Sequence, residues 1–171
     1  MRNYSHYGIT VSQTGVAPLT RARHDERGCP LGTMTPAEME VLIGTHMLAE
    51  EHGDPERAVS VYTEDVEHDV VGFPGDPIHG VQAALERYHQ LVKDLRVEKA
   101  ERTHTYYSDD AATTEDLITA VATGAFLGIP GNNRRITFRM LHVFEFKDGR
   151  ISRENVWLDG ASIAAQLTAA A

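Results

Sequence analysis

The sequence has almost no cysteine and no long apolar run. Its single cysteine, Cys29, excludes an intrachain disulfide framework and a cluster of thiolate metal ligands. No stretch approaches the roughly 20 consecutive apolar residues that a membrane-spanning helix needs. Residues 1–10 lack the charged-then-apolar order of a secretory signal. We therefore expect a cytoplasmic protein without a membrane partner.

The sequence is also short of positive charge. Lys and Arg total 16 against 25 Asp and Glu, which gives a formal net charge of −9. No basic cluster suited to a nucleic-acid backbone is present, and no glycine-rich phosphate loop or nucleophile elbow occurs. The nine histidines include no pair at metal-ligand spacing that cysteine or a carboxylate cluster supports. These absences predict a protein with no nucleic-acid partner, no metal and no cofactor.

The 171 residues suffice for one ordinary domain. Residues 1–33 show no sustained hydrophobic period, and we expect an N-terminal extension there, either flexible or an arm. The domain is expected over residues 34–171. Its first helix starts with Thr35 as N-cap, Pro36 in the first turn and Glu38 as capping-box partner.

Helices come first and strands follow. The first helix ends at Gly53, the second runs from Asp54–Pro55 to about Thr63, and a third covers residues 80–95. From Arg96 onward, four strand-like runs are separated by turn signals, and a short helix closes the chain. This order predicts an α+β domain in which a bent antiparallel sheet wraps the helices.

Two adjacent residues, His68 and Asp69, lie in a short strand-like run just before a loop that contains Gly72 and Pro74. Neighbouring strand residues point to opposite faces, so only one of the pair can face a pocket. Asp69 is a candidate base, with a turn-initiating carboxylate as its plain alternative. His68 would serve almost as well.

A further histidine, His142, lies in a row of apolar side chains. Its spacing from Phe138, Met140 and Phe144 is an even number of residues, so in a strand all four side chains point to the same face. His142 is the titratable group of that row. A buried histidine must find a partner or stay neutral. We predict that His142 faces a pocket and that its three neighbours bind an apolar ligand.

The order of elements and several motifs resemble the nuclear transport factor two superfamily of cone-shaped α+β folds. "FLGIPGNNRRITF", followed by "HVFEFKDGRI" and a strand with a tryptophan, is similar to the SnoaL-like polyketide cyclases. "GDPERAVSVYTED", followed by "DPIHG", is similar to ketosteroid isomerase. The resemblance covers roughly residues 35–168 and implies a cone-shaped curved sheet around three N-terminal helices, and a homodimer. Such motifs specify the fold well and the reaction poorly.

The resemblance also implies site residues. His46 falls where ketosteroid isomerases carry their oxyanion-holding tyrosine. His142 falls at the protonated aspartate of that hole and at an active-site histidine of the SnoaL-like cyclases. Tyr88 falls on a supporting tyrosine of the third helix. Asp69 lies close to the isomerase general base in a match that needs a one-residue gap before it and a longer loop after it. The plain alternatives are a satisfied core histidine for His46 and a core aromatic for Tyr88.

The pattern departs from the family on the last strand. The acid/base aspartate of the SnoaL-like cyclases is replaced by Val156, which we count with the apolar lining, so the anthracycline-ring aldol cyclisation is not implied. Glu154, two residues earlier on the same face, offers a carboxylate, although charged residues in "SRENVW" commonly face solvent. The Asp-Arg-Asp trio of limonene epoxide hydrolases is not matched either, because Arg139 has the wrong parity to join His142.

These residues predict cofactor-free acid/base chemistry on a hydrophobic, polycyclic or polyketide-like carbonyl compound. Asp69 or His68 would take a proton next to the carbonyl, and His142 and His46 would hold the enolate oxygen, with Tyr88 orienting them. Isomerisation, aldol-type cyclisation and dehydration all follow from that enolate. One alternative is a non-catalytic small-molecule binding protein of the same fold. Another is a dimer that functions through its open sheet face.

Overall fold

The computed structural model describes residues 34–170, so the expectation for residues 1–33 lies outside the described range. Within residues 34–170, no helix is long and apolar enough to cross a membrane.

Helix α1 (Pro36–Glu51) begins as the sequence predicts. The Thr35 hydroxyl accepts from the Glu38 backbone N–H at 3.3 Å, and the Glu38 carboxylate accepts from the Thr35 N–H at 2.8 Å. This reciprocal capping box satisfies two otherwise free donors. The buried face of α1 follows the helical period and consists of Met39, Ile43, His46 and Ala49.

Helix α2 (Pro55–Val59), capped by Asp54, is shorter than predicted. The helix was expected to reach Thr63, but strand β1 (Tyr62–Val70) has already begun at Tyr62. Val61, Tyr62 and Thr63 are β-branched or aromatic and favour a strand. Strand β1 also pairs in parallel with strand β8 (Arg150–Leu158), and this pairing favours a strand over the predicted helix.

The third helix, α3 (Val81–Asp94), follows the short strand β2 (Ile78–His79). It buries Ala84 and Tyr88, which are four residues apart and therefore share a face. This face packs into the same hydrophobic cluster as α1 and β1, so the Tyr88 hydroxyl is delivered to the interior.

The main sheet has six strands in the order β2-β1-β8-β7-β4-β3, where β3 is Leu95–Tyr107, β4 is Ala111–Ala122 and β7 is Arg134–Lys147. All neighbours are antiparallel except β1 and β8. The run predicted as one strand over residues 111–129 is interrupted. Its end forms strand β5 (Ala125–Phe126), which pairs with β6 (Ile129–Pro130) across a turn where Leu127 and Gly128 have φ of 50° and 73°.

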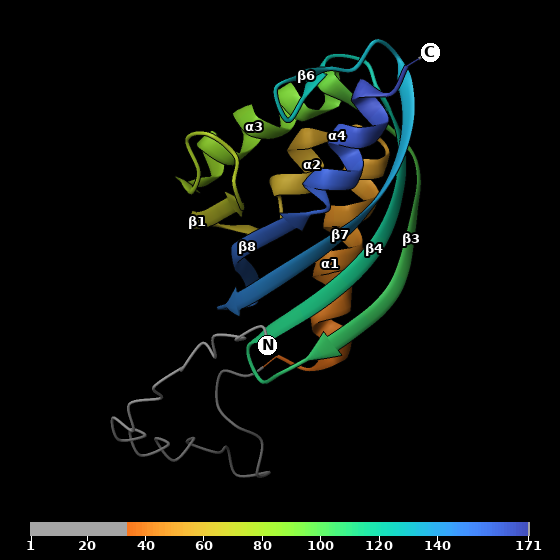
Figure 1. Ribbon diagram of the computed structural model, residues 1–171. Coiled ribbons are helices and arrows are strands. Elements are labelled where there is room, and N and C mark those ends of the chain that lie inside the picture. The colour runs from red at the N-terminus through yellow and green to blue at the C-terminus, as the bar shows by residue number, and fades with distance from the viewer. Residues whose placement is uncertain (1–33, 171) are drawn as a thin grey trace, which may run out of the picture. The chain divides into compact units, whose positions relative to one another are not determined.

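Figure 1 shows β3, β4 and β7 bending around the helices, with the C-terminal helix α4 (Gly160–Thr168) beside β7. The predicted α+β class with a curved, mainly antiparallel sheet is therefore confirmed. One apolar cluster joins α1 and α3 to β1 and β7, and a second joins α4 to β4 and β7. Tyr88 of the first cluster and Ile118 and Phe138 of the second all line one cavity, which places the cavity between the clusters.

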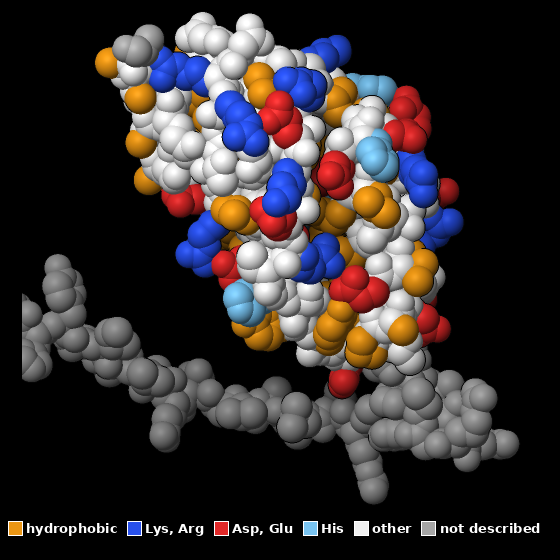
Figure 2. Space-filling view, turned by 90° about the vertical axis from the view of Figure 1, so that its right-hand side faces the viewer, with side chains coloured by type: hydrophobic (Ala, Val, Ile, Leu, Met, Phe, Trp, Pro, Cys, Tyr) orange, Lys and Arg blue, Asp and Glu red, His pale blue; other side chains and the backbone are white. Residues whose placement is uncertain are grey.

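The face of the sheet that includes β3 carries charges of both signs (Figure 2). Arg135 Nε lies 2.7 Å from Glu98 Oε2, and Lys99 Nζ lies 2.7 Å from Glu101 Oε1. Exposed pairs of this type contribute only about 0–1 kcal/mol to stability.

Candidate active site

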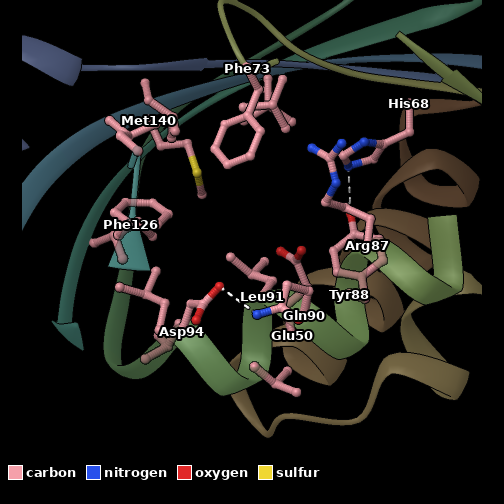
Figure 3. Close-up of a pocket in the computed structure, with 18 of the residues that line it drawn as sticks. Glu50, His68, Phe73, Arg87, Tyr88, Gln90, Leu91, Asp94, Phe126 and Met140 are labelled. Carbon is pink, nitrogen blue, oxygen red and sulfur yellow. Dashed lines mark hydrogen bonds between the residues drawn. The ribbon is translucent and has the colours of Figure 1, made fainter. Parts of the chain in front are cut away.

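The cavity has a volume of about 610 Å³ and a mostly apolar lining. Side chains from α3, β4, β5 and β7 form its apolar part, among them Leu91, Ile118, Phe126 and Met140 (Figure 3). Its size falls within the roughly 300–1,000 Å³ of small-molecule sites. The cavity is therefore large enough to hold a small hydrophobic molecule.

Five of the ionisable side chains that line the cavity gather in one part of it. They are Glu50, His68, Tyr88, His142 and Glu154. They come from α1, β1, α3, β7 and β8, which are far apart in sequence and meet because the sheet curves over the helices. Figure 3 shows Glu50, His68 and Tyr88 on the same side of the cavity, opposite Phe126 and Met140.

Glu154 is the centre of this cluster. Its side chain is fully buried on β8, the strand between β1 and β7. Its Oε2 accepts from the Tyr62 hydroxyl and from the Tyr88 hydroxyl (3.3 Å), and lies 3.2 Å from His46 Nε2. Burial alone would raise the pKa of Glu154, but the charge of His46 and its hydrogen bond, the largest opposing effects, hold it well below its usual value. Glu154 is therefore a buried, ionised carboxylate.

His46 lies behind Glu154. Its Nδ1 is 2.9 Å from the Ala58 carbonyl oxygen, and its Nε2 faces Glu154. Both ring nitrogens thus face acceptors, an arrangement that only the imidazolium satisfies. Burial opposes that charge, but the carboxylate of Glu154 outweighs it, and the pKa of His46 is raised to about 9. His46 is fully buried and does not line the cavity, so the predicted direct contact with a substrate oxygen is corrected to support of Glu154.

Tyr88 connects the cluster. Its hydroxyl oxygen lies 3.0 Å from Tyr62 Oη, 3.2 Å from His68 Nε2 and 3.3 Å from His46 Nε2. Burial, with the nearby charge of Glu154, raises the pKa of Tyr88 far above its usual value, so the phenol keeps its proton. Burial lowers the pKa of His68, which is therefore neutral near pH 7.

His142 faces the second oxygen of Glu154. Its Nε2 lies 3.4 Å from Glu154 Oε1, an oxygen that has no hydrogen-bond partner among the described residues. Its Nδ1 lies 3.7 Å from Asp116 Oδ2. The imidazole is thus placed between two buried carboxylates, with its Nε2 next to the one that lines the cavity.

Asp69 is placed away from the cluster, which corrects the first choice of base. Its carboxylate accepts from Asn155 Nδ2 at 2.8 Å and does not line the cavity, whereas its neighbour His68 does. Val66 and Val70 lie two residues before and after His68, so the three side chains point to the same face of β1. This alternation of apolar residues indicates that His68 is the inward residue.

The predicted apolar lining is present with one exception. Phe138, Met140 and Val156 line the cavity. Phe144 does not, because its ring fills the space between two histidines, with its centroid 5.3 Å from that of His142 and 5.9 Å from that of His46. Phe144 therefore holds the two histidine rings in place and does not form part of the ligand-binding surface.

Three cluster members were missed from the sequence. Glu50 lies four residues after His46 and so shares its face of α1, a spacing that was available as a signal. Tyr62 had been assigned to a helix, which hid its inward direction on β1. Asp116 lies in β4, and no feature of the neighbouring sequence distinguishes it from an acidic residue at the surface. Among residues 34–170, no group of three or more His, Cys, Asp or Glu is arranged to hold a metal ion.

A loop between β1 and β2 borders the cavity. Arg87 Nη2 lies 2.6 Å from Asp76 Oδ1 and Arg87 Nη1 lies 3.1 Å from Asp76 Oδ2. The Arg87 guanidinium carbon also lies 4.9 Å from the ring centroid of Phe73, which lines the cavity (Figure 3). This bidentate and stacked contact fixes the loop to α3.

Solved structures with the same fold share little sequence with this chain. TsrD from Streptomyces laurentii has a TM-score of 0.69 at 18% identity, covering 80% of this chain and 99% of its own. A polyketide cyclase-like protein from Xanthomonas campestris has a TM-score of 0.66 at 18% identity, covering 77% and 98%. An epoxide hydrolase of the limonene type from Mycobacterium tuberculosis has a TM-score of 0.62 at 18% identity, covering 77% and 90%.

Among curated protein sequences, none matches this chain significantly. The model of one family does match, over residues 42–167, which is most of the chain and includes every residue of the cluster. It is described as the SnoaL-like polyketide cyclase family. The resemblance expected from the motifs is therefore confirmed, and the chain belongs to the SnoaL-like polyketide cyclase family.

Proposed function

We propose that the protein is a cofactor-independent acid/base enzyme that moves a proton next to the carbonyl of a hydrophobic, polycyclic or polyketide-like compound. The observation that carries the proposal is the apolar cavity with Glu154, His142, Glu50 and Tyr88 gathered in one part of its lining. A ketone that enters this cavity leaves water and meets a base and hydrogen-bond donors together.

The base is the Glu154–His142 pair. Glu154 Oε1 and His142 Nε2 face each other at 3.4 Å, and Oε1 lacks a partner among the described residues. Oε1 is therefore free to take the α-proton of a bound ketone, with His142 Nε2 beside it.

Glu50 and Tyr88 supply the donors. Burial and the charge of Glu154 raise the pKa of Glu50, which favours its carboxylic acid form, and that acid can donate a hydrogen bond to a developing oxyanion. The Tyr88 hydroxyl, which donates to Glu154 Oε2 in the structure, becomes a second donor when its O–H turns to the oxyanion. Two carboxyl groups with pKa values shifted in opposite directions are a common acid/base division of roles.

The enolate has three outcomes. Return of the proton at another carbon is isomerisation, attack on a second carbonyl is aldol-type cyclisation, and loss of a β-hydroxyl is dehydration. All three share the first step, and the ligand decides which follows. Membership of the SnoaL-like polyketide cyclase family supports a polyketide-like ligand.

The first step can be tested without the natural substrate. In D2O, the protein is expected to speed exchange of the α-protons of 2-tetralone and of larger fused-ring ketones by about 10²-fold or more over buffer, as followed by proton NMR. Binding of these ketones without faster exchange of any of them would contradict the proposal and favour the alternative, a carrier protein.

The loop contact predicts an effect on binding. Arg87→Lys keeps the charge but loses the bidentate fork and the stacking on Phe73. We expect the Kd of 2-naphthol, a planar phenol, to rise about tenfold in a fluorescence titration, while kcat for exchange changes little.

The matched control is Arg135→Lys, which alters a pair with Glu98 in which neither residue lines the cavity. It should leave the Kd unchanged. An Arg87→Lys variant that binds 2-naphthol as tightly as the wild type would show that the loop does not close the cavity.

A further inference from the structure

We propose that His68 is a specificity-determining residue whose Nδ1 binds a second oxygen of the ligand, a hydroxyl group on the same ring as the carbon that loses its proton. The two oxygen-bearing carbons of such a ligand flank that carbon. This inference rests on the proposed function for the identity of the reacting carbon. The contact itself is a binding property, and it can be measured without any reaction.

The His68 ring is held at one nitrogen and has no partner at the other. Its side chain is 2% exposed and lines the cavity. Nε2 lies 3.2 Å from the Tyr88 hydroxyl oxygen, and the two rings meet edge to face with their centroids 5.4 Å apart. Nδ1 is buried and has no hydrogen-bond partner within residues 34–170. Buried polar atoms are normally paired, so a ligand in the cavity is the partner that this nitrogen lacks.

The backbone places His68 next to the base. His68 and Glu154 occupy paired positions on the parallel strands β1 and β8. Neighbouring strands lie about 4.8 Å apart, and side chains at paired positions share a face of the sheet. The Tyr88 hydroxyl lies 3.2 Å from His68 Nε2 and 3.3 Å from Glu154 Oε2, so it contacts both side chains. A ligand oxygen at His68 is therefore only about one strand spacing from a carbon that faces Glu154.

The first ligand oxygen fixes the relation between the two. The proposed function places that oxygen at Glu50 and Tyr88, and Figure 3 shows Tyr88 next to both His68 and Glu50. Both oxygen sites thus border the Tyr88 hydroxyl. Hydroxyl groups on two carbons that flank a single carbon have such close spacing, whereas a hydroxyl on a distant ring would lie among the apolar side chains of the cavity.

The surroundings of His68 favour a neutral group. The ionised Glu154 beside it repels a ligand carboxylate. The two cations that act on His68 already have partners, because His46 faces Glu154 and Arg87 binds Asp76 through both of its terminal nitrogens. A hydroxyl can donate to a bare ring nitrogen or accept from an N–H. It therefore fits Nδ1 whichever ring nitrogen of the neutral imidazole holds the proton.

The test is a set of fluorescence titrations of the full chain at pH 7 with naphthols. We expect 1,3-dihydroxynaphthalene, whose two hydroxyls flank one carbon, to bind about tenfold more tightly than 1-naphthol or 2-naphthol. The isomer 2,6-dihydroxynaphthalene has the same number of hydroxyls on separate rings, and it should bind no more tightly than 2-naphthol. This comparison needs only the wild-type protein.

Three variants assign the preference to one atom. His68→Phe keeps an aromatic ring without nitrogen, and it should reduce the preference for 1,3-dihydroxynaphthalene over 2-naphthol to less than about twofold. His68→Asn keeps a polar atom near the position of Nδ1 and should retain most of the preference. The control is His104→Phe, the same change as the first variant at an exposed histidine that does not line the cavity. It should leave the preference unchanged.

Equal affinity of the wild type for 1,3-dihydroxynaphthalene and for both naphthols would overturn the inference, and so would an equal gain with the 2,6 isomer. A folded His68→Phe that keeps the preference, or a folded His68→Asn that loses it completely, would overturn the role of Nδ1. A wild-type protein with the expected preference but no α-proton exchange would contradict the proposed function alone, so the two failures are distinguishable.

Discussion

Glu154→Gln is expected to lower kcat for α-proton exchange of 2-tetralone by about 10³-fold, with little change in the Kd of 2-naphthol. The amide has the shape of the carboxylate and keeps a carbonyl oxygen for the Tyr62 and Tyr88 hydroxyls. It has no basic oxygen to take the substrate proton at the position that faces His142 Nε2. Removing the acceptor therefore affects the chemical step far more than binding.

The matched control for Glu154→Gln is Glu115→Gln, the same change at a partly exposed glutamate that pairs with Arg139 and does not line the cavity. It should have no effect on exchange. A folded Glu154→Gln variant that binds 2-naphthol and keeps kcat within about threefold would exclude Glu154 as the base. His68, the neutral imidazole that also lines the cavity, would then take its place.

His46→Leu is expected to lower the free energy of unfolding by about 3–5 kcal/mol at pH 7, as measured by urea denaturation. The substitution leaves the buried carboxylate of Glu154 without its imidazolium partner, and the Ala58 carbonyl without a donor. Adding Glu154→Gln to this variant removes the unpaired charge. The double variant should therefore be more stable than His46→Leu alone.

The His46 effect is expected to depend on pH in a defined window. The pKa of His46 is raised from 6.5 to about 9 in the folded protein, so its charge stabilises the fold fully below pH 6.5. That contribution is lost as the pH rises through about 9. The difference in stability between the wild type and His46→Leu should therefore be smaller at pH 10 than at pH 6.

The exposed pair of His89 and Glu56, with 3.3 Å between Nε2 and Oε1, is the matched control for His46. His89→Leu should change stability by less than about 0.5 kcal/mol. A His46→Leu variant whose destabilisation is equal at pH 6 and pH 10 would show that packing, and not the ion pair, determines the role of His46.

Local sequence signals predicted the helices well. The Thr35–Glu38 capping box and the apolar spacing of α1 need only neighbouring residues, and both are present. The predicted end of α2 was wrong because it depends on the pairing of Tyr62 with Ile151. These two residues are far apart in the sequence, so no local pattern indicates the pairing. The β5–β6 turn at Leu127 and Gly128 was likewise hidden in an uninterrupted β-like run.

The site was only partly predictable. Resemblance to a known family placed His46, Tyr88 and His142 near the cavity or behind it. Glu154 was on the correct face by alternation but was ranked low, because a glutamate in a strand is usually solvated. What makes it central is the convergence of side chains from α1, β1, α3 and β7, and that convergence depends on the curvature of the sheet rather than on any local pattern.

The most direct test of the central claim is a crystal structure of the protein with 2-naphthol, a planar analogue of the enol of 2-tetralone. The account predicts that the naphthol oxygen lies about 2.6–3.2 Å from the Tyr88 hydroxyl or the Glu50 carboxyl group. It also predicts that ring carbon 1 faces Glu154 Oε1 and His142 Nε2. A naphthol oxygen among Leu91 and Phe126, with no ring atom near Glu154, would contradict the claim.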